Sequence, residues 1–146
     1  MMVVTAESCT GGLISALLTE IPGSSAVVDR AYVTYSNEAK MQCLGVADEL
    51  LRTHGAVSEE VARAMAEGAL ANAAAQASMS VTGIAGPGGE TPGKPVGLVH
   101  IAAALEGRPT AHRECRFGDI GRTEVRIATV DAAIALLMSQ LQASDQ

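Results

Sequence analysis

The sequence predicts an α/β fold: a single domain in which helices cover both faces of a mixed, mainly parallel central sheet, a three-layer α/β/α sandwich. Three observations predict it. Short apolar segments rich in β-branched residues alternate with segments whose apolar residues recur at helical spacing. Two of the short segments follow each other directly, as the strands of a hairpin do. The chain has 146 residues, with neither an internal repeat nor a linker, so we expect one domain spanning 1–146.

Five segments are predicted to be strands because each is short and either β-branched or alternating in hydrophobicity. They cover residues 2–5, 26–35, 78–81, 96–105 and 110–117. The last two flank the turn Glu106-Gly107-Arg108-Pro109, which predicts a hairpin.

Five segments are predicted to be helices from their apolar periodicity and their terminal residues. They cover residues 13–21, 38–44, 48–54, 58–76 and 122–141. Ser36 and Ser58 are the expected N-caps of the second and fourth helices, and Gly45 is expected to end the second. In the last helix the residues expected to face the sheet are Val125, Ile127, Val130, Ile134, Leu137 and Leu141.

The composition excludes several classes of ligand. Ten basic residues stand against sixteen acidic ones, a formal charge of −6 at pH 7 that a general DNA or RNA binder would not carry. The aromatic residues are Tyr32, Tyr35 and Phe117, too few for the stacking platforms that bind single-stranded nucleic acid. We therefore expect no nucleic-acid partner, and an anionic ligand would have to be bound locally, by a few arginines or a helix N-terminus.

The three cysteines, Cys9, Cys43 and Cys115, form no CxxC pair and no Cys/His zinc pattern, so we expect reduced thiols, no metal site and no cofactor. The N-terminus lacks the basic region and the long apolar run of a signal peptide. No apolar stretch approaches the roughly 18 residues of a membrane span. The expected location is the cytoplasm, without a membrane partner.

The first candidate site is the segment 7–12, which lies between a strand and a helix. Free N–H groups at a helix start favour an anion or an oxyanion, and the two glycines that end the segment let a substrate approach the backbone closely. Ser8 is placed to act as a nucleophile, with Cys9 as the rival. The alternative is structural: Ser8 or Thr10 caps the helix, and Cys9 packs in the core.

A serine nucleophile needs a base. The histidines, His54, His100 and His112, show no partner pattern that would suggest a Ser-His-Asp arrangement. Lys40, one of two lysines, falls on a short helix behind the second strand. Burial and a nearby positive charge such as Arg122 would lower its pKa from about 10.4 to about 7 to 8, so that a neutral amine accepts the proton. The alternative is a solvated helix lysine.

The segment 82–95 is rich in glycine and proline, which favours a binding loop after a strand. Residues 88–94 match the GxxxxGK part of a phosphate-binding P-loop, but Pro95 stands where a Ser or Thr would ligate magnesium, and a strand follows in place of a helix. We therefore reject nucleotide hydrolysis. A ligand-binding loop and a merely irregular connection both stay open.

Two arginines open the last helix. Arg122 and Arg126 are four residues apart, so they share a face and could clamp a phosphate. The alternative is a surface arginine paired with Asp119 or Glu124.

Taken together, these segments resemble the CinA C-terminal family, also called the nicotinamide-nucleotide amidohydrolases. The segments that carry the resemblance are AESCTGG at 6–12, VTYSNEAK at 33–40, TGIAGPGG at 82–89, GLV at 97–99 and FGDIGR at 117–122. They span nearly the whole chain in the family's order, and the first and third are long and unusual.

The resemblance implies hydrolysis of the carboxamide of nicotinamide mononucleotide to nicotinic acid mononucleotide and ammonia, in pyridine nucleotide salvage. It implies Ser8 as the nucleophile and Lys40 as its general base, with Tyr35 and Thr82 completing the catalytic set. The residues it implies for substrate binding are Cys9, Thr10, Gly11, Gly12, Gly83, Gly86, Gly88 and Arg122.

The expected partner is thus a small pyridine nucleotide. A small alanine-rich domain with long apolar helices also favours a homo-oligomer, most simply a dimer. Family members usually carry an amphipathic helix before the first strand, whereas this sequence starts almost at that strand. The alternative function is a non-catalytic nucleotide-sensing or regulatory module, since family domains also occur joined to other domains in competence-related proteins.

Overall fold

Strands and helices follow one another in the order that the sequence predicts. The computed structural model describes residues 1–145, within which five strands and five α-helices form. The strands are β1 (Val3–Glu7), β2 (Val28–Val33), β3 (Ala77–Gly83), β4 (Leu98–Leu105) and β5 (Ala111–Arg116). The helices are α1 (Leu13–Thr19), α2 (Asn37–Leu44), α3 (Asp48–His54), α4 (Glu59–Ala71) and α5 (Arg122–Ser144), with a 3₁₀ turn at Ser24–Ala26.

The strands form one mixed sheet with the order β2-β1-β3-β4-β5. β1 pairs in parallel with both β2 and β3, while β4 is antiparallel to β3 and to β5. Of the strands in the described part of the chain, four therefore run in one direction and β4 runs in the other, and β4–β5 is the predicted hairpin. The carboxyl ends of β1, β2 and β3 meet at one edge of the sheet, which is where ligands of open α/β sheets bind.

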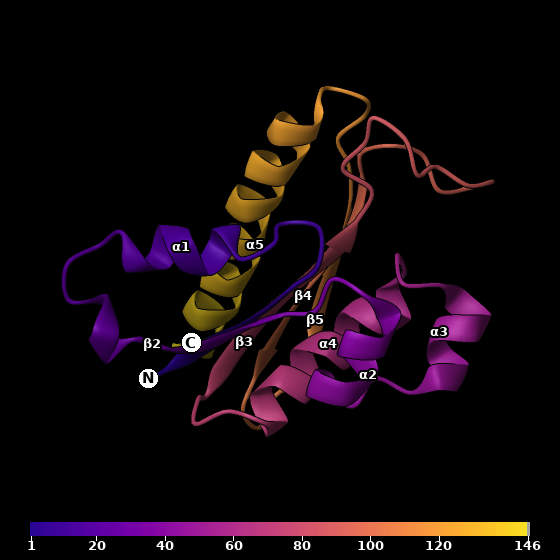
Figure 1. Cartoon of the computed structure of the whole chain (residues 1–146). Helices are drawn as coiled ribbons and strands as arrows, with labels where there is room; N and C mark the ends of the chain where they lie inside the picture. Colours follow the sequence, from indigo (N-terminus) through magenta and orange to yellow (C-terminus); the bar gives the residue numbers. More distant parts are fainter. Residues whose placement is uncertain (146) are drawn as a thin grey trace.

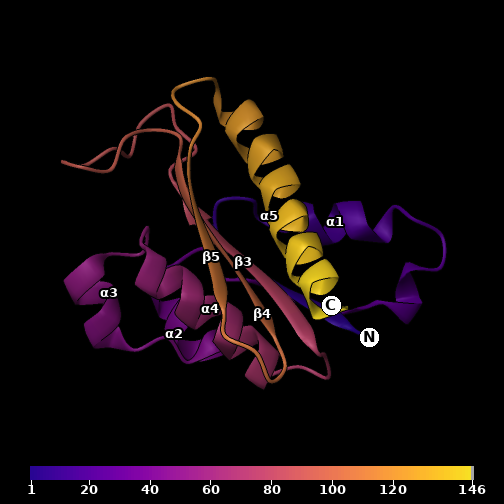
Figure 2. The ribbon, with the colours of Figure 1, turned by 180° about the vertical axis from the view of Figure 1, so that it is seen from behind.

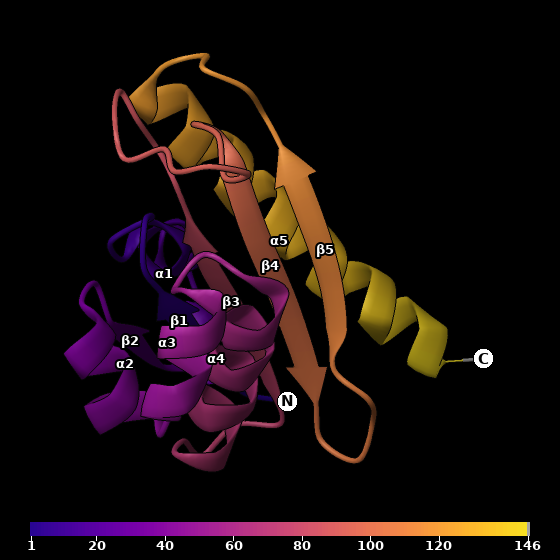
Figure 3. The same cartoon turned by 90° about the vertical axis from the view of Figure 1, so that its right-hand side faces the viewer.

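Helices cover both faces of the sheet, and this confirms the predicted three-layer arrangement. α2, α3 and α4 lie on one face, and α1 and α5 lie on the other (Figure 1 and Figure 2). In the view along the β4–β5 edge, the sheet separates α4 from α5 (Figure 3). α4 packs on β1, β3 and β4, and α5 packs on β3 and β4.

An apolar core fills each side of the sheet. Ile14 and Val125 are buried on the α5 side, and Val4 and Met65 are buried on the α4 side. Because helices cover both faces, every residue of β1 and of β4 is buried, and the alternation of apolar and polar residues is lost there. The buried polar side chain at the carboxyl end of β1, Glu7, is therefore an unusual feature of the sheet.

The predicted helix caps form. Ser36 Oγ accepts a hydrogen bond from Ala39 N at 3.0 Å, and Ser58 Oγ accepts one from Val61 N at 3.3 Å. Gly45 ends α2 in the left-handed conformation, with a φ of 68°. These caps fix where α2 and α4 begin, and α2 carries one of the candidate site residues.

α4 is shorter than the prediction of 58–76, because it ends at Ala71. The amide of Asn72 donates from Nδ2 to Gly68 O at 2.8 Å and so binds the last turn of the helix. By Gln76 the chain has already returned to the sheet, where Gln76 N donates to Met2 O at 3.0 Å.

α5 buries Val125, Val130 and Leu137 as predicted, but Ile127 is 52% exposed, so the prediction for this residue is wrong. Helical residues are about 100° apart, which places Ile127 about 200° from Val125. α5 is also, within residues 1–145, a helix long and apolar enough to cross a membrane, which the sequence analysis did not expect. One such helix is weak evidence for a span, since core helices pass the same test.

Candidate functional site

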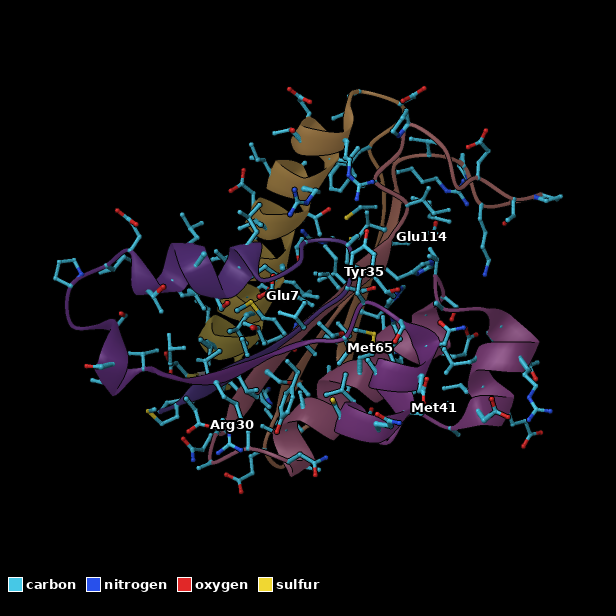
Figure 4. The ribbon with its side chains drawn as sticks, viewed as in Figure 1. Glu7, Arg30, Tyr35, Met41, Met65 and Glu114 are labelled. Atoms are coloured by element: carbon cyan, nitrogen blue, oxygen red, sulfur yellow. The ribbon has the colours of Figure 1, made fainter. Side chains whose placement is uncertain are left out.

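A cavity of about 310 Å³ lies at the carboxyl ends of β1 and β3, beside the segment that joins β2 to α2. Most of the residues predicted for the site line this cavity: Ser8, Cys9, Tyr35, Lys40, Thr82, Gly83, Gly86, Gly88 and Arg122. Figure 4 shows Tyr35 at this end of the sheet, with Glu7 nearby on the α1 side. Thr10, Gly11 and Gly12 do not line the cavity and lie in the turn behind Ser8.

The centre of the site is a hydrogen bond between Ser8 and Lys40. Ser8 follows the last residue of β1, and Lys40 comes from α2 and is 1% exposed. Lys40 Nζ lies 3.0 Å from Ser8 Oγ. Lys40 also donates to Thr34 O at 2.8 Å and to Tyr35 O at 3.5 Å, so three oxygens surround the amine. The alternative of a solvated helix lysine is therefore excluded.

Burial lowers the pKa of Lys40 from 10.5 to about 8, because the charged amine loses its hydration. The Cys9 thiol works weakly in the opposite direction. Arg122 makes no marked contribution, so burial accounts for the lowered pKa without the positive neighbour that we expected.

Cys9 is a poor rival to Ser8. Its side chain is 6% exposed and packs in the core on the α5 side of the sheet, as the structural alternative predicted. Burial raises the pKa of the Cys9 thiol to about 11, so the thiol stays protonated at neutral pH. Since the thiolate is the reactive form of cysteine, the buried thiol of Cys9 is the weaker candidate nucleophile of the two.

The turn that carries Ser8 is held by Glu7, whose side chain lies on the opposite side of the strand from Ser8. Glu7 is fully buried, and its carboxylate accepts from Thr10 Oγ1 at 2.7 Å and from Ile14 N at 2.8 Å. It also accepts from Ser15 N at 3.1 Å. Thr10 is therefore bound to Glu7. Gly12 is the N-cap residue of α1 and has no side chain, so the Glu7 carboxylate caps the helix instead.

Arg126 binds the same turn from the side of α5. Its Nε donates to Cys9 O and its Nη2 donates to Thr10 O, each at 3.1 Å. Arg126 does not line the cavity that Arg122 lines, so the structure does not bring together the two arginines of the predicted phosphate clamp. The separation arises because the two side chains, although four residues apart on α5, extend to different loops.

Thr82 and Gly83 form the wall of the cavity at the end of β3. Thr82 Oγ1 donates to Ala56 O at 2.8 Å, so its hydroxyl ties β3 to the segment before α4. A Cβ at Gly83 would lie 2.6 Å from Val99 Cγ2 and 2.8 Å from Leu98 O, which leaves room for glycine and for no larger residue.

Arg122 crosses the mouth of the cavity. Its Nη1 donates to Gly86 O at 2.7 Å, and its Nη2 donates to Tyr35 OH at 3.0 Å. Arg122 thus connects the start of α5 with the glycine-rich loop and with the segment after β2. It pairs with neither of the carboxylates, Asp119 and Glu124, that the alternative offered.

The histidines lie away from this cavity. His100 Nδ1 and His112 Nε2 are 2.9 Å apart on β4 and β5, and His54 ends α3. Among residues 1–145, no three His, Cys, Asp or Glu side chains are grouped closely enough to hold a metal ion.

The sequence analysis missed the roles of two residues that it named, Glu7 and Arg126, and missed several residues of the cavity altogether. Glu7 and Arg126 hold the turn, and Ala56, Val57 and Ile84 line the cavity. The acidic residue directly before Ser8 was a visible signal, because a carboxylate at the end of a buried strand needs hydrogen-bond donors. Nothing in the local pattern of Ala56 and Val57 marks them as part of a site.

The fold and the site define an α/β domain with a buried serine–lysine pair at the carboxyl ends of parallel strands. A family model of the CinA C-terminal domain matches residues 1–141. The chain belongs to the CinA C-terminal domain family, which confirms the resemblance of its motifs.

Solved structures of related proteins share the fold closely. The competence/damage inducible protein CihA from Agrobacterium tumefaciens is 57% identical, with a TM-score of 0.94 over 95% of this chain and 84% of its own. The competence damage-inducible protein A (ComA) from Klebsiella pneumoniae is 38% identical, with a TM-score of 0.91 over 97% of this chain and 86% of its own.

Curated relatives are longer. A CinA-like protein from Syntrophobacter fumaroxidans is 52% identical over 134 residues, which are 90% of this chain and 31% of that protein. One from Anaeromyxobacter dehalogenans is 51% identical over 141 residues, which are 96% of this chain and 34% of that protein. The chain thus spans about a third of the length of the curated relatives that it matches.

Proposed function

We propose that this chain hydrolyses the carboxamide of nicotinamide mononucleotide to nicotinic acid mononucleotide and ammonia, by a Ser–Lys mechanism, in pyridine nucleotide salvage. The observation that carries the proposal is the 3.0 Å contact between Lys40 Nζ and Ser8 Oγ inside the cavity. The motifs of the family suggest the substrate, and the residues of this chain suggest the chemistry.

Lys40 is suited to be the general base. A neutral amine has two N–H groups and one lone pair, and the carbonyls of Thr34 and Tyr35 take the two N–H groups. The lone pair is then left to accept the proton of the Ser8 hydroxyl. With a pKa of about 8, roughly a tenth of Lys40 is neutral at pH 7.

In the proposed reaction, Ser8 Oγ attacks the carboxamide carbon while its proton passes to Lys40 Nζ. The N–H of the residue after a serine nucleophile commonly stabilises the oxyanion, and Cys9, which follows Ser8, lines the cavity. Lys40 then donates its proton to the departing nitrogen, and ammonia leaves. Water, deprotonated by Lys40, hydrolyses the ester on Ser8; the carboxylate is released, and Ser8 regains its proton.

Arg122 is suited to the phosphate of the substrate. A guanidinium has five N–H donors, and the contacts with Gly86 and Tyr35 use two of them. The remaining donors leave Arg122 able to bind a phosphate at the mouth of the cavity. Such a contact would favour the nucleotide over the riboside.

The test is to incubate the protein with nicotinamide mononucleotide and to measure ammonia. We expect release by the wild type, loss in Ser8→Ala with little change in Tm, and retention in Cys9→Ala as the matched control. Full activity in Ser8→Ala, or loss confined to Cys9→Ala, would contradict the Ser8 assignment. Tight binding without turnover would favour the alternative of a nucleotide-sensing module. The homodimer and the cytoplasmic location stay predictions of the sequence analysis.

A further inference from the structure

The turn between β1 and α1 contains more buried hydrogen bonds to charged groups than capping of α1 requires. The carboxylate of Glu7 accepts four bonds, two on each oxygen: from Thr10 Oγ1 and Ile14 N, and from Thr5 Oγ1 and Ser15 N. The two backbone donors belong to the first turn of α1. A Ser, Asn or Asp at the N-cap would satisfy such donors without a fully buried carboxylate. The cap here is Gly12, which has no side chain.

Arg126 binds the same turn through its backbone carbonyls. The planar guanidinium reaches the two successive carbonyls of Cys9 and Thr10 with two different nitrogens. A fork of this kind fixes direction as well as distance. Within residues 1–145, Arg126 makes no ion pair with a carboxylate, so its charge is used on the backbone of the turn.

Along the chain, Ser8 lies between Glu7 and the two carbonyls that Arg126 binds. Its own backbone is also bound at both ends, since Ser8 N donates to Val81 O at 3.1 Å and Ser8 O accepts from Gly11 N at 3.0 Å. Burying a carboxylate is costly even when it is hydrogen-bonded. The arrangement is therefore better explained by the geometry it fixes than by the stability it adds.

We propose that Glu7 and Arg126 are positioning residues for Ser8: Glu7 binds hydrogen-bond donors of the turn, Arg126 binds two of its carbonyls, and together they hold the Ser8 hydroxyl at the Lys40 amine. The proposal rests on the proposed function where activity is the readout, because misplacement of a reacting group by about 1 Å costs on the order of 10²-fold in rate. The titration of the Lys40 amine, in contrast, tests the positioning role without relying on the proposed function.

The kinetic test compares Glu7→Gln and Arg126→Lys with the wild type. Glutamine keeps the size of Glu7 but turns an NH₂ group towards a donor, and lysine keeps the charge of Arg126 but loses the fork. We expect kcat on nicotinamide mononucleotide to fall on the order of 10²-fold in each, with KM within about threefold. The matched control is Ser78→Ala, which removes a fully buried hydroxyl that donates to Ala66 O, outside the cavity. It should lose stability and keep kcat within about twofold.

The second readout is the titration of Lys40, followed by NMR of the lysine side chains. Lys40 and Lys94 are the two lysines of the chain, so Lys94 is an internal reference. In Glu7→Gln, a loosened turn admits water and moves the midpoint of Lys40 up, from about 8 towards 10.5. Loss of the negative charge on its own would move the midpoint down, so the two effects differ in sign. Arg126→Lys should also move it up.

A kcat within threefold of wild type in both variants, or a Lys40 midpoint that is unchanged or lower in both, overturns the positioning role. If the wild type releases no ammonia, the proposed function fails, and the Lys40 titration still decides the positioning role. If Glu7→Gln does not fold, Arg126→Lys decides it with both readouts.

Discussion

The turn 8–12 and the glycine-rich loop 84–97 both contribute residues to the cavity, the turn through Ser8 and Cys9 and the loop through residues in 84–89, but they are held in different ways. The turn is bound by Glu7 and Arg126, and Thr10 within it is fully buried. The loop is bound at its base, where Ile84 N donates to Leu98 O at 2.9 Å and Gly97 N donates to Ile84 O at 2.8 Å. From 87 to 93 it is exposed, and it extends beyond the sheet (Figure 1).

The difference separates two tasks. In the proposed mechanism, proton transfer between Ser8 and Lys40 depends on a distance that a fixed turn can maintain. Enclosing a ligand depends on backbone that can adapt, and a loop with few anchors provides it. Changes at the fixed side should therefore reduce kcat, and changes at the loop side should raise KM.

The largest effect is expected at Lys40. Lys40→Met should lower kcat/KM on the order of 10³-fold, because the base is lost, and Lys40→Arg should not restore it, because guanidinium keeps its proton. In the proposed mechanism the neutral amine is the active form, so kcat/KM of the wild type should rise with pH and reach half its maximum at about 8. The measurement is the pH–rate profile with nicotinamide mononucleotide.

Lys40→Arg decides between two roles. An arginine variant that works at more than about a tenth of the wild-type rate would refute the general base and leave a positioning charge. Its folding is checked by Tm, since a guanidinium fills more space beside Thr34 and Tyr35.

The second-largest effect is expected at Arg122, which binds the glycine-rich loop through Gly86 O. Arg122→Ala should raise KM for the nucleotide by roughly 10-fold to 100-fold, the worth of a charged hydrogen-bonded contact, and lower kcat less. The contact with Gly86 O is lost as well, so the loop should become more mobile. The measurement compares nicotinamide mononucleotide with its riboside. If the variant keeps the wild-type preference for the nucleotide, Arg122 does not bind the phosphate.

Local signals predicted the fold well. Ser36 and Ser58 cap their helices, and Gly45 ends α2, because these interactions involve residues three or four apart. The error at Ile127 arises because burial, unlike capping, does not depend on local sequence alone. The sequence marks it as apolar, but whether an apolar helical residue is covered depends on what packs beside it, and no element covers Ile127 fully.

The site could be predicted only in part, because some of its properties depend on contacts between segments that are distant in the sequence. Ser8 and Lys40 could be proposed from their positions after a strand and on a helix, but the burial that lowers the Lys40 pKa comes from packing of distant segments. Arg126 contacts carbonyls 116 and 117 residues away along the chain, at Thr10 and Cys9. No spacing rule in a single sequence relates positions so far apart. The sequence analysis therefore assigned Arg126 to the same phosphate site as Arg122, and not to the turn that carries Ser8.

A matched pair of glycines compares the two segments directly. Gly12 in the turn has a φ of 103°, whereas Gly88 in the loop has ordinary dihedrals and open space around its Cβ position. Gly12→Ala should destabilise the fold by about 1 to 3 kcal/mol and lower kcat about tenfold. Gly88→Ala should leave the free energy of unfolding unchanged or raise it by about 0.5 kcal/mol, and affect KM before kcat. Denaturant unfolding and steady-state kinetics measure both; equal losses of stability would show that the turn and the loop are equally constrained.

The smallest effect is expected at Lys94, which ties the outer part of the loop to α3. Lys94 Nζ donates to His54 O at 2.5 Å, at the negative end of the helix dipole, while its backbone pairs with Thr91. Lys94→Met removes the side-chain tie and leaves the backbone pair, so we expect KM to rise about twofold to threefold and kcat to stay unchanged. Glu90→Gln, at the exposed tip and outside the cavity, is the control and should match the wild type. A tenfold loss of kcat in Lys94→Met would mean that the loop takes part in the chemical step, and the division of tasks between turn and loop would then be wrong.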